Sequence, residues 1–195
     1  MLAVAMIQLR YQTPDAWTQG VLADFDAFLA DHAACERKAS ATGLNFVVRY
    51  PDRIEMIGPM IAFAREELTH FQQAWAWLKK RDLRLVSDEK DAYIRRLLLH
   101  VRTAGDERLL DRLIMASVVE ARGHERFGLV AAALPEGKLK AFYVSICESE
   151  GRHAGFFLEM AALYFDDETI AGRLDEFLEY EATAIADLPF RAAVH

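Results

Sequence analysis

Two Glu-x-x-His motifs occur in this chain, and a single glutamate precedes each of them by about 30 residues. Residues three apart on an α-helix share a face, so each motif directs a carboxylate and an imidazole toward one point. Four carboxylates and two imidazoles in this arrangement predict a dinuclear metal site inside a four-helix bundle. The six candidate ligands are Glu36, Glu67, His70, Glu120, Glu150 and His153.

Two proline-containing turns explain how the chain would bring these residues together. Pro51 lies midway between Glu36 and Glu67, and Pro135 bears the same relation to the second pair of glutamates. In an antiparallel helix pair, residues equidistant from the turn lie at the same height, which here is roughly 20 Å from each turn at a rise of ~1.5 Å per residue. The sequence therefore predicts two helical hairpins, each with a glutamate opposite a Glu-x-x-His motif.

The pattern is helical nearly throughout, because ten glycines and five prolines interrupt 195 residues and strand-like alternation is not sustained. The first expected helix begins after a cap at Thr13-Pro14, and the next runs from about Asp24 to Tyr50. After a break at Pro51-Asp52 a helix runs to about Arg81, and a shorter one runs from a cap at Ser87-Asp88 to Val101. The last three run from Gly105 to near Leu134, from the turn at Pro135-Glu136-Gly137 to about Phe165, and from a cap at Asp166-Asp167 to just before Pro189. The segment 81–105 is long enough for the crossover of a ferritin-like bundle. We therefore expect one all-α domain over residues 1–195, a ferritin-like antiparallel four-helix bundle with extra terminal helices.

Composition narrows the classes of protein to consider. A net charge of −7 argues against indiscriminate nucleic-acid binding, and no apolar run approaches the ~18–20 residues that cross a bilayer. The start, residues 1–7, lacks the basic segment of a secretory signal. The two cysteines, Cys35 and Cys147, have no Cys-x-x-Cys partner, and we interpret them as core residues. These features predict a cytoplasmic protein without a membrane partner.

The donor types indicate which metal the site would hold. Carboxylates with imidazoles suit iron or manganese better than copper or zinc. From their places in the hairpins, Glu67 and Glu150 are expected to bridge two ions, and the remaining glutamate and histidine of each hairpin would complete one ion. Open positions would remain for dioxygen. Surface charges without a metal are the alternative, but two mirrored motifs amid apolar neighbours argue against it.

Two further histidines lie one helical turn from a candidate ligand. His124 follows Glu120 and His32 precedes Glu36. Each is a candidate for contact with a metal ligand, or else a plain polar contact to a neighbouring helix. For His124 we favour a role other than direct ligation.

The context of the motifs resembles a known family. Residues 120–127, Glu-Ala-Arg-Gly-His-Glu-Arg-Phe, and residues 149–153, Ser-Glu-Gly-Arg-His, are similar to signatures of the tRNA hydroxylases that act on 2-methylthio-isopentenyl-adenosine beside the anticodon. Residues 31–39 and 65–71 also fit, and the resemblance covers about residues 20–165. Gly151 stands where that family usually has alanine.

The resemblance implies a non-haem di-iron monooxygenase. The six candidate ligands would hold two iron ions (Fe2+/Fe3+), dioxygen would be the co-substrate, and a separate reductase would supply electrons. The substrate would be a tRNA anticodon loop, hydroxylated on its isopentenyl group. Candidate phosphate contacts, for which a solvated helix end is an equal alternative, are Lys79, Lys80, Arg81, Arg84, Arg95, Arg96 and Arg102.

Two other functions fit the six ligands. One is a different ferritin-like oxidase or peroxidase that acts on a small molecule, which needs no basic surface. The other is a non-enzymatic iron-binding or storage protein, which usually needs a cage assembly. The oligomeric state does not follow from the sequence.

Overall fold

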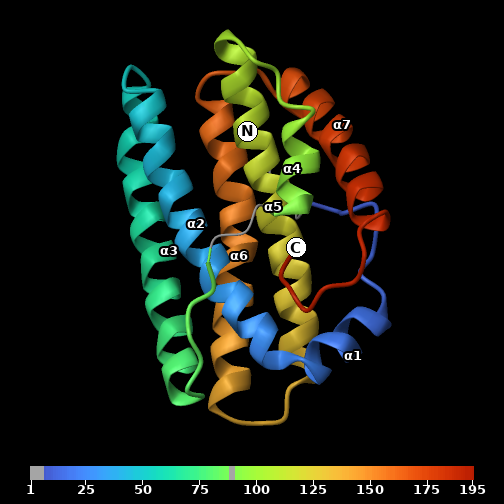
Figure 1. Ribbon diagram of the computed structural model, residues 1–195. Helices are drawn as coiled ribbons and strands as arrows, with labels where there is room; N and C mark the ends of the chain where they lie inside the picture. The colour runs from blue at the N-terminus through green and yellow to red at the C-terminus, as the bar shows by residue number, and fades with distance from the viewer. Residues whose placement is uncertain (1–6, 88–90) are drawn as a thin grey trace. The chain divides into compact units, whose positions relative to one another are not determined.

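The structure is a computed structural model that describes residues 7–87 and 91–195, and within those ranges the chain forms seven helices and no strand (Figure 1). Two expectations fall outside the described residues: that for the start of the chain, on residues 1–6, and that for a helix cap at Asp88. The chain divides into two compact units. One contains residues 19–89 and 191–194, and the other contains residues 1–18, 90–190 and 195. That residues 1–195 form a single domain remains a prediction.

The first unit is built on a helical hairpin of α2 (Phe25–Arg49) and α3 (Ile54–Lys80), which lie side by side in Figure 1. The predicted start of α2 is confirmed, since the Asp24 carboxylate accepts from the backbone N–H of Ala27. The two helices approach closely at Gly43, where a Cβ would lie 2.8 Å from the ring of Phe63. Glycine is therefore required at this crossing.

The turn between α2 and α3 lies at Pro51 and Asp52, where the sequence predicts a break. Arg53 precedes the first helical residue, so α3 begins at Ile54. The hairpin geometry is unaffected, because the turn still lies midway between Glu36 and Glu67.

The second unit contains a longer hairpin of α5 (Gly105–Ala133) and α6 (Lys138–Ala162), with α7 (Asp167–Ala186) packed on both. Gly137, in the α5–α6 turn, has a φ of +151°, a backbone conformation that favours glycine. The predicted cap of α7 is confirmed, because the Asp166 carboxylate accepts from the N–H of Thr169.

Helix α4 (Ala92–Leu98) packs on α7 and starts later than the sequence suggested. Its cap is Asp91, whose carboxylate accepts from the N–H groups of Tyr93 and Ile94, and Asp88 of the expected cap lies outside the described residues. The short helix α1 (Asp15–Ala23) begins directly after Pro14. The hydroxyl of Thr13, expected as its cap, instead donates to Glu125 at 2.7 Å.

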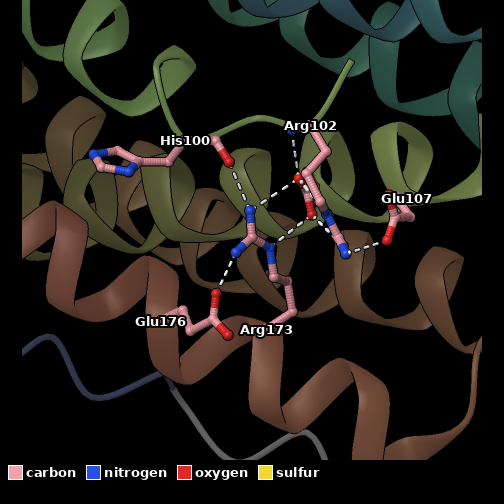
Figure 2. A network of polar contacts seen from close by, with 6 residues as sticks. His100, Arg102, Glu107, Arg173 and Glu176 are labelled. Atoms are coloured by element: carbon pink, nitrogen blue, oxygen red, sulfur yellow. Dashed lines mark hydrogen bonds and ion pairs between the residues drawn. The ribbon is translucent and has the colours of Figure 1, made fainter. Parts of the chain in front are cut away.

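A buried carboxylate fastens the segment after α4 to α5 and α7. Asp111 on α5 is fully buried and accepts from Arg102 and from Arg173 on α7, each at 2.7 Å. Figure 2 shows the two guanidinium groups converging, with Arg173 also donating to the carbonyl of His100 at 2.6 Å and Arg102 to Glu107 at 2.8 Å.

Among the described helices, none is long and apolar enough to cross a membrane.

Candidate metal centre

The α2–α3 hairpin brings together the first three candidate ligands. Glu36 comes from α2, and Glu67 and His70 come from α3 one turn apart. One ligand atom from each lies within 4.8 Å of the others, and all three side chains are buried. Nδ1 of His70 is 3.6 Å from a Glu36 oxygen and 3.7 Å from a Glu67 oxygen. The equal distances from the turn thus produce the convergence that the sequence predicts.

The α5–α6 hairpin repeats this arrangement with the second three. Glu120 comes from α5, and Glu150 and His153 come from α6. Their ligand atoms also lie within 4.8 Å of one another, and the side chains are buried. Nδ1 of His153 is 4.0 Å from Oε2 of Glu120. Each hairpin therefore presents two carboxylates and one imidazole at a single point.

The donor set fits a divalent metal ion. Buried carboxylates are costly unless a cation compensates them, and each group contains two. Oε2 of Glu36 is buried and makes no hydrogen bond within residues 7–87 and 91–195. Oxygen donors with one imidazole are typical of iron and manganese sites. These observations suit metal ligation.

Of the two histidines one turn from a candidate ligand, His32 contacts that ligand directly. His32 is fully buried, and its Nε2 lies 2.6 Å from Oε1 of Glu36. Burial raises the pKa of Glu36, but the hydrogen bond from His32 and the proximity of His70 outweigh it, so the pKa lies below its ordinary value. Glu36 is thus held as a carboxylate.

His124 contacts the backbone of the next helix rather than a candidate ligand. Its Nδ1 lies 2.8 Å from the backbone carbonyl of Cys147 on α6 and 3.5 Å from the Cys147 sulfur. The contact with the Cys147 side chain, opposed by burial and aided by the carbonyl, raises the pKa of His124 to about 9. Gly151 provides the space for this ring, since a Cβ there would lie 3.0 Å from Nδ1. Cys147 and Cys35, expected in the core, are half-buried.

The sequence reasoning missed a buried ionic network beside the α5–α6 group. Arg122 on α5 is fully buried and donates to both oxygens of Glu181 on α7, at 2.7 and 2.9 Å. It also bonds Glu125 and, at 3.1 Å, the hydroxyl of Thr13. Tyr93 on α4 donates to Glu181 at 3.3 Å. The one sequence signal was the position of Arg122 two residues after a candidate ligand, because Glu181 lies in an acidic segment without a motif.

Three of the candidate RNA contacts form ion pairs within the protein. Arg81 pairs with Asp26, Arg96 lies 3.6 Å from Asp187, and Arg102 is bound to the buried Asp111. Lys79, Lys80, Arg84 and Arg95 are exposed, as is Arg81 despite its ion pair.

The two lysines at the end of α3 lie beside aromatic rings. Nζ of Lys80 is 4.3 Å from the centre of the Trp77 ring, and Nζ of Lys79 is 6.0 Å from that of Trp75. A cation over an indole face is attracted by the ring, which favours a defined position for the ammonium group. These two lysines are therefore better candidates for phosphate contact than the paired arginines.

Comparison with known proteins gives consistent matches. The family model for tRNA-(MS[2]IO[6]A)-hydroxylase (MiaE) matches residues 1–195. A tRNA 2-(methylsulfanyl)-N(6)-isopentenyladenosine(37) hydroxylase of Pseudomonas putida is 36% identical over 82% of this chain and 77% of its own length. The protein of the same name from Salmonella typhimurium is 28% identical over 91% and 83%.

A solved structure is also similar. A Synechococcus protein with aldehyde deformylating oxygenase activity has 30% identity and a TM-score of 0.91, covering 97% of this chain and 96% of its own. This likeness, together with the seven helices of the described residues, confirms the predicted all-α, ferritin-like fold.

Proposed function

Because the chain belongs to the family of tRNA-(MS[2]IO[6]A)-hydroxylases (MiaE), we propose that it is an oxygen-dependent tRNA hydroxylase. Its substrate would be 2-methylthio-isopentenyl-adenosine beside the anticodon, hydroxylated on the isopentenyl group. The observation that carries this proposal is the family match over all of residues 1–195. The two buried groups of carboxylates and imidazole supply a second, independent support.

Two iron ions would be held by the six candidate ligands, Glu36, Glu67 and His70 of the α2–α3 hairpin and Glu120, Glu150 and His153 of the α5–α6 hairpin. Bound iron would supply the activation of dioxygen that hydroxylation of a C–H bond requires, with electrons from a separate reductase. The chain itself holds the ligands in a buried setting. The carboxylate of Glu36 is kept ionised, because its pKa lies below the ordinary value.

Recognition of RNA would rest on local charge, because the whole chain carries −7. An anticodon loop offers an unstacked, modified base that a pocket can hold without reading base pairs. Lys79 and Lys80 would contact the phosphates. Replacing both with glutamine is expected to weaken tRNA binding and to lower its dependence on salt, as lost phosphate contacts do. Changing Gln72 and Gln73 of α3 to glutamate is a matched control for the same change in net charge on the same helix.

Mass spectrometry of tRNA nucleosides tests the proposal directly. Cells with the gene should contain the hydroxylated nucleoside, and cells without it should accumulate the unhydroxylated precursor. Complementation with Glu150→Ala should fail, whereas Glu148→Ala, two residues away and exposed, should restore the product. An unchanged level of hydroxylated nucleoside in cells lacking the gene would sink the proposal.

The likeness to the Synechococcus protein supports a second candidate, an oxygenase that acts on an aldehyde. The two functions use the same ligand groups and differ in substrate. Purified protein loaded with ferrous iron and given a reductase would be offered a long-chain aldehyde and the tRNA separately. Loss of the formyl group from the aldehyde, with the tRNA unmodified, would favour this alternative.

A further inference from the structure

The carboxylate that α2 contributes has a histidine partner of its own. His32 lies one turn before Glu36, its Nε2 is 2.6 Å from Oε1, and both side chains are buried. An ionised carboxylate can only accept a hydrogen bond, so Nε2 of His32 is the donor. The ring of Phe28, with its centre 6.4 Å from that of His32, lies beside the imidazole. One oxygen of Glu36 is therefore committed to a fixed partner.

The other oxygen of Glu36 faces the rest of the α2–α3 group. Oε2 lies 3.6 Å from Nδ1 of His70 and is a buried atom without a hydrogen bond in the described part of the chain. A metal ion bound among these residues would thus meet Oε2 as the oxygen of Glu36 that makes no hydrogen bond. The His32 contact occupies one lone pair of Oε1 and fixes the orientation of the carboxylate, which favours ligation through Oε2 over chelation through both oxygens.

The α5–α6 group lacks this restraint. His124 lies one turn from Glu120, but it directs Nδ1 to the carbonyl of Cys147. Within the described ranges no hydrogen bond reaches Glu120, and its contact with Nδ1 of His153 is 4.0 Å long. Glu120 can therefore bind through one oxygen or both, and can change between the two.

We propose that His32 is a positioning residue that orients Glu36 to ligate through Oε2 and so makes the two metal positions inequivalent. The inference rests on the proposed two-ion centre and adds a difference between its halves. The α2–α3 position keeps a constant coordination, and the α5–α6 position adapts as ligands come and go. Partners that orient a ligand in this way are typically worth about 10–100-fold in metal affinity.

A spectrum of the wild-type protein tests the asymmetry without any variant. The full chain would be loaded with two equivalents of ferrous iron under anaerobic conditions and examined by Mössbauer spectroscopy. Inequivalent positions should give two quadrupole doublets of equal area. A single doublet with both ions bound would overturn the inference.

Titration of the metal-free chain with Co2+, followed by absorption, tests the residue itself. His32→Leu should weaken one of the two equivalents about 10–100-fold and leave the other unchanged. His32→Gln keeps an N–H donor and should recover part of the loss. His124→Gln is the matched control and should leave both equivalents as they are.

The outcomes separate the two levels of proposal. Equal weakening of both equivalents in His32→Leu, or no weakening, would overturn the role of His32. A fall to one bound ion would also overturn it, because His32 would then be a ligand in its own right. A wild-type chain that binds fewer than two ions would overturn the proposed centre and this inference together.

Discussion

Removal of the Glu181 carboxylate is expected to destabilise the protein strongly. Glu181 and Arg122 are both fully buried, and two hydrogen bonds of 2.7 and 2.9 Å join them. Burial opposes the charge on Arg122, but the bonds and charge of Glu181 raise its pKa above the usual value, so the guanidinium stays charged. Breaking a buried pair from one side costs about 3–5 kcal/mol.

The remaining partners of Arg122 set where in this range the cost should lie. Glu125 and Thr13 still accept from its Nη1 atom after Glu181→Ala. Part of the charge is thus still compensated, so we expect a loss near the lower limit, about 3 kcal/mol of unfolding free energy. Urea unfolding of the full chain, followed by circular dichroism, measures it.

Two further variants make the reasoning refutable. Glu179→Ala removes an exposed carboxylate of the same helix that pairs with Arg10, and should cost at most about 1 kcal/mol. The double variant Arg122→Met with Glu181→Leu leaves no buried charge from this pair and should recover most of the stability. A loss below about 1 kcal/mol in Glu181→Ala, or a double variant as unstable as the single one, would refute the account.

Three other predictions concern packing and protonation. Gly43→Ala places a Cβ 2.8 Å from a neighbouring ring and should cost about 1–3 kcal/mol in urea unfolding, whereas Gly172→Ala, with open space in α7, should be neutral or stabilising by up to about 1 kcal/mol. Gly151→Ala should displace the His124 ring and lower stability by about 1 kcal/mol, the worth of a hydrogen bond, and an unshifted His124 NMR signal would contradict it. Because folding raises the pKa of His124 from 6.5 to about 9, its contribution is complete below pH 6.5 and is lost as the pH rises through about 9. The stability difference between wild type and His124→Gln should therefore shrink over that window, and a difference constant with pH would exclude the protonation argument.

The sequence predicted the parts of the fold that follow local rules. The proline turns give the helical hairpins and place Glu36 opposite Glu67, since helix rise alone determines the height of a residue above its turn. The cap of α7 at Asp166 was predicted for the same reason, since capping is a local contact. The start of α4 was not, because Asp91 offers the same capping chemistry as the residues expected before it.

Contacts between distant parts of the chain were beyond such rules. His32 and His124 each lie one turn from a candidate ligand, yet one bonds its glutamate and the other a carbonyl of the next helix. The pairing of Arg173 with Asp111 and of Arg122 with Glu181 depends on how α5 and α7 pack. Nothing in the local sequence distinguishes these arginines from solvated ones.

The network around Arg122 also has a consequence for the order in which the chain folds. Helices α2 and α3 follow each other in sequence and pack together. This hairpin can therefore form early in synthesis, because local contacts close with little loss of chain entropy. Arg122 bonds Thr13, 109 residues before it, and Glu181, 59 residues after it. The ion pair that neutralises the buried Arg122 guanidinium must therefore wait until α7 has left the ribosome.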